Sequence, residues 1–461
     1  MTVIRIFNHY VSRTGFILLL FEMLILHAAA SATALLWSGT PRGSSDAYLT
    51  GMLFALVNVF AMSTLGLYQQ LFREDLRGAL MRIPPAFAVG FVLLSALMEV
   101  TPAIDLGRAT GLAFVLGGAC VLMTRVLLFT SAQSDILVER LILIGAGALA
   151  RECLELAATR GGPRRFDVVG CIAMPNEERC VPAAKVLKPG ESLLTLARRH
   201  GANELVISVT DRRNGAYPVR ELLDCALGGV RVTDAAAFFE REASQIRVDS
   251  LQPSYLIHGG GFDQSFLRAF VKRSFDLVAS AAICAATLPV MLLAALCIVV
   301  EDGGPVIFRQ DRVGKNGRVF QVLKFRSMGM DAESDGKPRW ASAADPRVTR
   351  VGHWLRKLRI DELPQMFNVF RGEMSFVGPR PERAYFVEQL ERDIAYYDVR
   401  HSIKPGITGL AQVRYQYGAS VEDAVRKLQY DLYYVKNNSL FLDLLILIDT
   451  VQVVLSGKGA R

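Results

Sequence analysis

Four long apolar stretches open the chain and constrain its fold more than any other feature. They cover residues 16–37, 47–67, 84–100 and 110–130. Each is close to the roughly 20 residues that an α-helix needs to cross a bilayer. We therefore predict a four-helix transmembrane bundle within residues 1–132. Because three further stretches follow the first and no small-residue cleavage site stands out, we expect the first to remain in the mature protein.

Composition indicates a chain that lies partly in lipid and partly in water. Apolar residues make up 51% of the 461 residues, yet charged residues reach 21%, and this length predicts two or three domains. The net charge of +8 suits nucleic acid, anionic lipid headgroups or phosphorylated substrates and does not choose among them. The seven cysteines are scattered without Cys-x-x-Cys spacing, which argues against a zinc site and favours reduced, buried thiols.

Arginines in the connections predict the orientation of the bundle. One group lies before the first stretch or between the second and third: Arg5, Arg13, Arg73, Arg77 and Arg82. The other two connections carry only Arg42 and Arg108. By the positive-inside rule, both ends of the bundle face the cytoplasm. Glu22 and His27 within the first stretch could mark a transport path, but we favour a polar contact inside the bundle.

Residues 133–258 are typical of a small Rossmann-like α/β domain. A buried strand at 141–144 enters a helix through Gly145, Gly147 and Ala150, a turn that can point backbone N–H groups toward a pyrophosphate. Further strands are expected at residues 167–172, 204–208 and 229–233. No acidic residue stands plainly at the end of the second strand to hold a ribose, since Glu177 follows a proline. A bound dinucleotide and a structural or regulatory domain both stay open, and we favour the second.

A fifth apolar segment, residues 275–300, is long enough to span a membrane but has two features of a re-entrant helix. Lys272 and Arg273 precede it, and six basic residues follow between positions 309 and 326, so both flanks carry the charge expected of the cytoplasmic side. Pro289 at its centre removes a backbone donor and kinks or breaks a helix. A helix-break-helix that enters and leaves one leaflet satisfies both observations. A kinked full span is the alternative.

Two shorter stretches are predicted to lie at the membrane interface. In residues 353–359, Trp354, Leu355 and Leu358 share one helical face with basic residues around it, a pattern suited to lipid headgroups. Residues 440–455 are apolar but interrupted by Asp443 and Asp449. We expect this segment to lie in the interface or to pack against the re-entrant element.

Basic residues follow a predicted β-hairpin after the fifth segment. The sequence Lys-Asn-Gly-Arg at 315–318 is a good turn between two β-rich runs. Lys324 and Arg326 are two residues apart on the second run, so they are expected on the same face. Two fixed cations could hold a diphosphate. A charged, exposed strand face would look the same.

Two neighbouring carboxylates, Asp361 and Glu362, precede Pro364, which suits the first turn of a helix. The pair could bind Mg²⁺, or one carboxylate could attack phosphorus directly. An acidic first turn that interacts with the helix dipole is the alternative reading.

A rigid arginine comes shortly after this pair, in the sequence Gly-Pro-Arg-Pro-Glu-Arg at 378–383. Pro379 and Pro381 restrict the backbone on both sides of Arg380, so its guanidinium has little entropy left to lose on binding. An aimed arginine, paired carboxylates and a basic strand together describe a phosphoryl-transfer site.

Five motifs stand in a fixed order in the last part of the chain. They are Phe-Asp at 275–276, Lys-Phe-Arg-Ser-Met at 324–328, Asp-Glu-Leu-Pro-Gln at 361–365 with Asn-Val at 368–369, Gly-Pro-Arg-Pro at 378–381, and Lys-Pro-Gly-Ile-Thr-Gly at 404–409. In this order they closely resemble the catalytic domain of bacterial monotopic phosphoglycosyl transferases, the polyprenyl-phosphate sugar-1-phosphate transferases that start exopolysaccharide and O-antigen repeats. The resemblance covers residues 262–461. The preceding helices and α/β domain resemble the large members more loosely.

The resemblance implies a ping-pong reaction. Asp361 would attack the β-phosphate of a UDP-sugar and release UMP, and undecaprenyl phosphate would then displace Asp361 from the sugar-phosphate. Glu362 would organise the phosphates with Mg²⁺ or another divalent cation, held by Asp361 and Glu362. The residues expected to bind the substrate phosphates are Lys324, Arg326, Arg356, Arg380 and Arg383. The residues expected to line the pocket are Pro379, Pro381, Gln365 and Asn368.

The resemblance also sets the expected surroundings of the reaction. It implies the bacterial inner membrane, a catalytic domain on the cytoplasmic face, and a possible homodimer, with no nucleic-acid partner. Glucose or galactose is the expected sugar, although no residue distinguishes them. Leu288 departs from the small polar residue frequent before the helix-breaking proline. A membrane-anchored nucleotide sensor and a scaffold or transporter are the competing functions.

Overall fold

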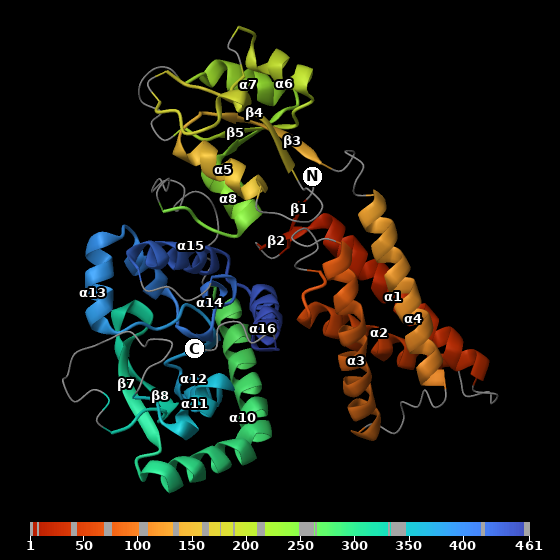
Figure 1. Ribbon diagram of the computed structural model, residues 1–461, viewed down its shortest axis with the longest axis vertical. Coiled ribbons are helices and arrows are strands. Elements are labelled where there is room, and N and C mark those ends of the chain that lie inside the picture. The colour runs from red at the N-terminus through yellow and green to blue at the C-terminus, as the bar shows by residue number, and fades with distance from the viewer. Residues whose placement is uncertain are drawn as a thin grey trace. The chain divides into compact units, whose positions relative to one another are not determined.

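The computed structural model describes most of the chain, in two compact units: Met1–Ile6 with Tyr10–Arg241, and Phe7–His9 with Glu242–Arg461 (Figure 1). The described residues are 3–6, 9–37, 44–68, 76–100, 109–131, 138–158, 166–175, 177–187, 190–209, 217–248, 262, 265–330, 332, 347–415 and 420–455. The domain boundaries expected at 132/133 and 258 lie outside them, as do Arg42, Arg73 and Arg108. The three-domain division therefore stays a prediction.

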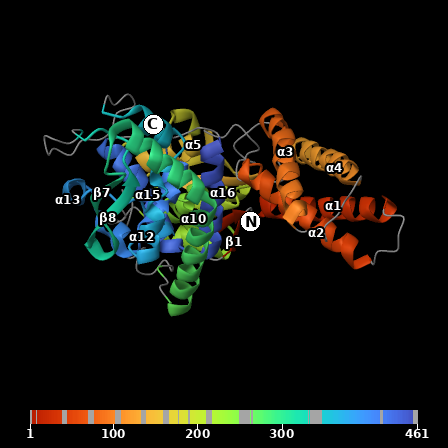
Figure 2. The same cartoon turned by 90° about the horizontal axis from the view of Figure 1, so that it is seen from below.

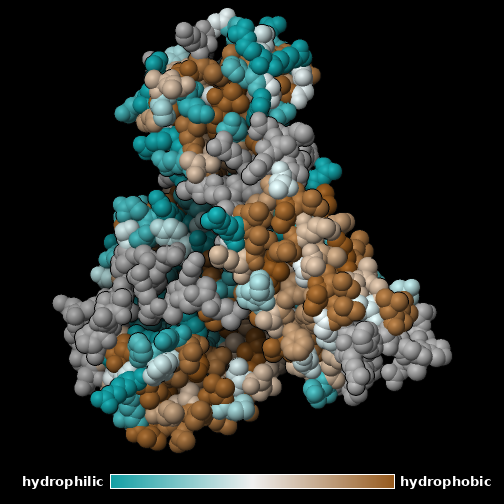
Figure 3. All heavy atoms as spheres, turned by 45° about the vertical axis from the view of Figure 1, so that its right-hand side comes forward, coloured by the Kyte–Doolittle hydropathy of each residue, from teal (hydrophilic) through white to brown (hydrophobic). Residues whose placement is uncertain are grey.

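Long apolar helices form the first part of the first unit. They are α1 (Arg13–Trp37), α2 (Ser44–Thr64), α3 (Leu76–Val100) and α4 (Ala109–Ser131), and a short pair of strands, β1 (Val3–Ile6) and β2 (His9–Ser12), precedes them. Each of the four helices is long and apolar enough to cross a membrane. Leu26, Phe54 and Leu94 are buried between them, while hydrophobic side chains cover much of their outer face (Figure 3).

A buried ion pair joins the first and last of these helices. The Arg125 Nε atom lies 2.9 Å from Glu22 Oε1, and neither side chain is exposed. The Tyr68 hydroxyl also donates to Glu22 at 2.7 Å. Glu22 thus forms a polar contact between these helices, which is the interpretation that we favoured for this residue.

The second part of the first unit is an α/β domain with a four-stranded parallel sheet in the order β4-β3-β5-β6. Its strands are β3 (Glu139–Ile144), β4 (Phe166–Ile172), β5 (Glu204–Ile207) and β6 (Arg231–Asp234). Its helices are α5 (Ala148–Ala158), η2 (Ala183–Lys185), α6 (Leu193–His200), α7 (Val219–Leu227) and α8 (Ala235–Ala243). Because helices cover a parallel sheet, strand β3 inside it carries an apolar run, Leu141–Ile144, that is fully buried.

The second unit has several buried clusters, and the largest includes Leu428, Leu432 and Tyr433 of α15, which are fully buried. Its elements are α10 (Phe266–Asp302), β7 (Ile307–Val313), η3 (Lys315–Gly317), β8 (Val319–Phe325), α11 (Arg350–Lys357), η4 (Ile360–Glu362), α12 (Gln365–Arg371), β9 (Ser375–Val377), α13 (Ala384–Asp393), η5 (Tyr397–Ser402), β10 (Gly406–Thr408), α14 (Leu410–Arg414), α15 (Val421–Asn437) and α16 (Leu440–Leu455). The predicted hairpin is confirmed, since β7 and β8 pair antiparallel. β9 and β10 pair in parallel.

The long helix α10 has two arms that meet at a bend (Figures 1 and 2). Pro289 lies inside α10 and lacks the N–H that would complete the helical hydrogen bonding, which gives a physical reason for the bend. The predicted break is thus a bend within one continuous helix. Side chains such as Leu292, Leu293 and Val300 are exposed, and α10 is also long and apolar enough to span a membrane.

Polar side chains fix the first arm of α10 to the unit. Lys272 Nζ donates to Asp443 Oδ2 at 2.7 Å, so α16 packs beside α10, which was one of the two placements expected for residues 440–455. Asp276 Oδ1 accepts from the Ser375 hydroxyl and the Phe376 N–H, both at 3.0 Å. The helix is therefore anchored at the start of its apolar part.

The prediction that the apolar residues of α11 lie together at the membrane interface is wrong for one residue. Trp354 and Leu358 are exposed, but Leu355 is buried among side chains of α10 and β8, including Met291 and Phe325. The α-helical spacing put all three residues together, whereas packing on α10 takes one of them into the interior.

Candidate functional site

Asp361 and Glu362 lie in a short 3₁₀ turn, η4, between two helices of the second unit. Arg359 precedes the turn with φ of 59°, a left-handed conformation that is uncommon for a residue with a side chain. This residue reverses the chain after α11, and Pro364 then leads into α12. The two carboxylates are thereby placed at a tight bend, with Asp361 largely buried.

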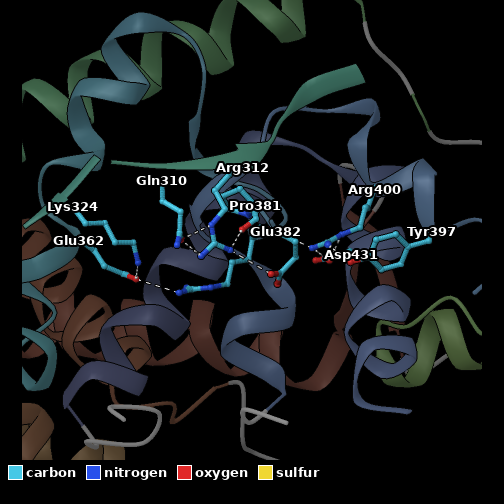
Figure 4. Close-up of polar contacts among 10 residues, drawn as sticks. Gln310, Arg312, Lys324, Glu362, Pro381, Glu382, Tyr397, Arg400 and Asp431 are labelled. Atoms are coloured by element: carbon cyan, nitrogen blue, oxygen red, sulfur yellow. Dashed lines mark hydrogen bonds and ion pairs between the residues drawn. The ribbon is translucent and has the colours of Figure 1, made fainter. Parts of the chain in front are cut away.

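Glu362 is held by three cations from three different segments. Its Oε1 atom lies 3.1 Å from Lys324 Nζ and 3.4 Å from Arg380 Nη2, and its Oε2 atom lies 3.8 Å from Arg359 Nη1. Figure 4 shows Lys324 and Glu362 at one end of a row of polar contacts. Burial opposes ionisation of Glu362, but these positive charges prevail and hold its pKa well below the usual range.

Asp361 has the opposite environment although it is the next residue in the chain. Within the described part of the chain, its carboxylate makes no hydrogen bond or ion pair. Burial raises the pKa of this carboxyl, and the negative charge of Glu362 adds to the rise. The charges of Lys324, Arg356 and Arg359 act against it. A desolvated, unbonded carboxylate beside cations is suited to attack an anionic phosphorus centre.

The backbone around Arg380 is fixed at four successive carbonyl groups, those of residues 379–382. The first and last accept from the N–H groups of Gly406 and Val313, each at 2.9 Å. The Arg380 carbonyl accepts from Arg400 Nη2 at 2.9 Å, and the next carbonyl accepts from Arg312 Nη1 at 3.0 Å (Figure 4). The predicted rigidity of this segment thus comes from hydrogen bonds as well as from its two prolines.

Pro379 and Pro381 contribute to the site through their carbonyl groups, as part of this row. Gln365 is buried at the start of α12. Asn368, on the same helix, is fully buried and accepts from the Leu323 N–H at 3.0 Å. Its amide also donates to the carbonyl of Gln321 at 2.7 Å. Asn368 therefore ties α12 to β8 next to Lys324.

Arg326 is not brought to the carboxylates. Its guanidinium donates to the carbonyl groups at the end of α10, with Nη2 at 3.1 Å from Asp302 O and 2.7 Å from Gly303 O. Because β8 ends at Phe325, the strand alternation that predicted one face for Lys324 and Arg326 stops before Arg326. Lys324 meets Glu362, and Arg326 caps the helix C-terminus.

The two remaining predicted arginines are placed differently. Arg356 Nε donates to the Ser327 hydroxyl at 2.9 Å, and its charge acts on Asp361. Arg383 is the N-cap residue of α13, where its carbonyl accepts from the next turn. Arg359, Arg312 and Arg400 were not among the site residues predicted from the sequence. Arg359 directly precedes the Ile-Asp-Glu sequence, which was an available signal, whereas the other two are identified only by their contacts.

The glycine turn of the α/β domain is covered by its own chain. The Ala146 N–H donates to Glu177 Oε2 at 2.7 Å, and the Ala146 carbonyl accepts from the Cys180 N–H at 2.8 Å. A Cβ atom on Gly147 would lie 2.5 Å from Glu177 Oε1. A carboxylate thus occupies the position at which Gly145, Gly147 and Ala150 were considered for a pyrophosphate.

The acidic side chains limit how a metal ion could be held. Among the described residues, no three or more His, Cys, Asp or Glu side chains are grouped as metal ligands. Asp361 and Glu362 supply carboxylate oxygens, which suit Mg²⁺ when substrate phosphates and water complete its shell. The pair fits a metal shared with a substrate better than a resident structural ion.

The part of the chain that contains Asp361 and Glu362 is similar to known bacterial sugar transferases. A family model described as bacterial sugar transferase matches residues 267–457. A UDP-N-acetylgalactosamine-undecaprenyl-phosphate N-acetylgalactosaminephosphotransferase of Aeromonas hydrophila is 44% identical over 242 residues, covering 52% of this chain and 56% of the relative. An undecaprenyl-phosphate glucose phosphotransferase of Komagataeibacter xylinus is 44% identical over 194 residues, covering 41% and 36%.

A shorter relative is covered more completely. The UDP-glucose:undecaprenyl-phosphate glucose-1-phosphate transferase of Caulobacter vibrioides is 44% identical over 192 residues, which cover 41% of this chain and 71% of the relative. The chain spans 56% and 36% of the two longer relatives' lengths. The matched residues contain every element that surrounds Asp361 and Glu362.

Proposed function

Since this chain is a membrane protein of the bacterial sugar transferase family, we propose that it transfers a sugar-1-phosphate from a UDP-sugar to undecaprenyl phosphate and releases UMP. The proposal is supported by the names of its relatives, which specify undecaprenyl-phosphate transfer of glucose or N-acetylgalactosamine phosphate. It is supported independently by the chemistry of the site.

The first half-reaction forms a covalent intermediate on Asp361. An oxygen of its carboxylate attacks the β-phosphorus of the UDP-sugar, and the bond from that phosphorus to the bridging oxygen of UMP breaks. The electron pair leaves with UMP. In the second half-reaction, a phosphate oxygen of undecaprenyl phosphate attacks the same phosphorus. The bond to Asp361 breaks, and the polyprenyl diphosphate sugar is the product.

The single observation that carries this proposal is the contrast between the two carboxylates. Asp361 is buried and makes no hydrogen bond with the described residues, so its oxygens are available to react. Glu362 is engaged by Lys324 and Arg380, cations that can turn to the substrate phosphates and stabilise the charge that develops in transfer. A mere acidic helix start would not need this arrangement.

Asp361 and Glu362 would hold Mg²⁺ together with the substrate phosphates, and the ion would neutralise phosphate charge. Arg356 and Arg383 are proposed to act with Lys324 on the phosphates. Arg326 contributes by holding the end of α10 in place.

The membrane elements explain how a lipid phosphate can reach Asp361. We propose that α1–α4 form a transmembrane bundle and that the bent helix α10 is re-entrant, with the catalytic residues at the cytoplasmic face of the inner membrane. The α/β domain is proposed to be Rossmann-like and structural or regulatory, because Glu177 takes the donor that a pyrophosphate would need. We propose three parts at 1–132, 133–258 and 262–461, although residues from Glu242 onward already pack with the second unit.

The sugar is proposed to be a hexose, and the product the first lipid-linked intermediate of exopolysaccharide or O-antigen assembly, with a homodimer possible. One relative's name specifies N-acetylgalactosamine, so a donor panel must include UDP-N-acetylgalactosamine beside UDP-glucose and UDP-galactose.

The test is UMP release by the purified full chain, with and without undecaprenyl phosphate. Without the acceptor, we expect a burst of about one UMP per active site and a sugar-phosphate mass on the peptide that carries Asp361. Asp361→Asn should abolish both, whereas Asp393→Asn, at an exposed position of α13, should change neither. Normal turnover by Asp361→Asn would exclude the proposed nucleophile.

A further inference from the structure

The Arg380 side chain reaches Glu362 from a backbone segment that several hydrogen bonds hold in place. The side chain is 38% exposed, yet its Nη2 atom comes within 3.4 Å of Glu362. The flanking prolines restrict rotation but leave the position of the whole segment open. That position is set by donors from outside the segment, and Arg400 is the one that contacts the Arg380 carbonyl itself.

Arg400 is a buried guanidinium with every nitrogen engaged. Its Nε donates to Asp431 Oδ2 at 3.1 Å, and its Nη2 lies 2.8 Å from the same oxygen. Its Nη1 donates to the Tyr397 hydroxyl at 2.7 Å. Arg400, Asp431 and Tyr397 are all nearly completely buried, and Figure 4 shows them grouped at the end of the contact row opposite Lys324.

Burying the Arg400–Asp431 ion pair adds little to the stability of the fold, so we looked for another role of the pair. Moving a guanidinium and a carboxylate out of water carries a large desolvation penalty, and an apolar pair of similar volume is often as stable. The planar fork of an arginine can contact a carboxylate, a hydroxyl and a carbonyl at fixed angles, which a lysine ammonium cannot do. The Arg380 carbonyl is the partner that links this buried group to the candidate active site.

We propose that Arg400, paired with Asp431, is a positioning residue for the transfer reaction and acts by fixing the backbone of Arg380. The inference rests on the proposed function, because it assumes that the Arg380 guanidinium stabilises the transferred phosphate. A displacement of about 1 Å at such a group can cost about 100-fold in rate.

A double-mutant cycle between Arg400 and Arg380 tests the proposal. We expect Arg400→Lys to lower kcat/KM for UMP release about 10- to 100-fold in the wild-type background. In the Arg380→Ala background, the same change should lower it less than about threefold, because the group that Arg400 positions is already gone. A purely structural residue would cause the same loss in both backgrounds, and that result would overturn the proposal.

Two further variants separate positioning from folding. Tyr397→Phe keeps the buried ring and removes only the hydroxyl that accepts from Arg400, so it should fold and show a smaller loss that again disappears with Arg380→Ala. Arg241→Lys is the matched control, since Arg241 pairs with Glu204 at 2.9 Å in the other unit. It should leave kcat/KM within about twofold.

Hydrogen exchange reads the position of the segment without any assay of activity. The N–H groups of Gly406 and Val313 donate to the carbonyls of Pro379 and Glu382, the first and last residues of the segment that contains Arg380. Both should exchange at least about tenfold faster in Arg400→Lys, and unchanged exchange would contradict the proposal. A wild type that releases no UMP would overturn the proposed function and this inference with it, whereas an active wild type with additive losses would overturn the inference alone.

Discussion

Asp361 and Glu362 are neighbours in the chain, but the charges and hydrogen bonds around their carboxylates differ. Glu362 meets three cations within 4 Å, which favour its ionised form. Asp361 is desolvated, and the neighbouring negative charge disfavours its ionisation. The carboxylate with the raised pKa is the stronger base and nucleophile of the two, so burial and neighbours have divided the roles before any substrate binds.

Neutralising Glu362 should therefore move the pH dependence of the reaction. Protonated Asp361 cannot attack phosphorus, so activity falls as the pH drops through its pKa, which lies above the ordinary value of 3.8. Glu362→Gln removes the negative charge that helps to raise this pKa, so the acidic limb should shift to lower pH. The measurement is the pH profile of the residual UMP burst in wild type and variant.

The outcome depends on the sign of the shift and not on the size of the residual rate. Glu362→Gln is expected to lower the burst rate at every pH, because Glu362 organises the site. An acidic limb that stays in place or moves to higher pH would contradict the electrostatic coupling between the two carboxylates.

At the scale of elements, the sequence predicted what local patterns determine. The apolar lengths of α1–α4, the β7–β8 hairpin and the proline in α10 depend on residues that are neighbours in the chain. The exit of Arg326 toward α10 and the burial of Leu355 depend on partners far along the chain. Arg359 adopts a left-handed conformation that propensity alone disfavours.

The candidate site was predictable to a similar extent. The ordered motifs identified the family and the carboxylate pair, because each motif is a short, fixed spacing of residues. The hydrogen bonds from Arg312 and Arg400 to the Arg380 segment could not be predicted. They join β7 and η5 to a loop, and contacts between such distant segments leave no periodic pattern in the sequence.

The anchor of α10 gives an element-scale prediction about stability. Asp443→Asn should lower the free energy of unfolding by about 3 kcal/mol, because it leaves the Lys272 ammonium without its carboxylate in a poorly solvated place. Denaturant unfolding in detergent measures the change. Asp393→Asn, which alters an exposed carboxylate, should change it by less than about 0.5 kcal/mol. Equal stability of the two variants would show that the ion pair does not anchor α10.

At the scale of the whole molecule, the second unit should work without the first. Ile246 is fully buried in the core of the second unit, and its N–H donates to the Gln429 carbonyl at 3.0 Å. A fragment of residues 242–461 should therefore release UMP in detergent. A fragment of residues 262–461 should be less stable by about 2 kcal/mol, the cost of losing one buried isoleucine.

Melting temperature and UMP release of the two fragments check this prediction. Equal stability would show that residues 242–248 do not belong to the folded catalytic unit. An inactive but folded fragment of residues 242–461 would show instead that the reaction requires the first unit.

The re-entrant topology predicts which side of the membrane β7 occupies. In Asp311→Cys, the new thiol should react with a membrane-impermeant maleimide only after the inner membrane is permeabilised, because the re-entrant topology puts both flanks of α10 on the cytoplasmic side. Asp105→Cys, in the connection predicted to face the periplasm, should react once the outer membrane alone is opened. Equal labelling of the two positions before permeabilisation would support a full span of α10.

The carboxylate of Glu177 over the glycine turn has a consequence for the α/β domain in the cell. A ligand that binds only the folded state adds to stability in proportion to its concentration. We propose that a domain whose glycine turn is already contacted by its own Glu177 side chain does not depend on such a ligand for its fold. Its stability would then be independent of the supply of dinucleotides in the cell.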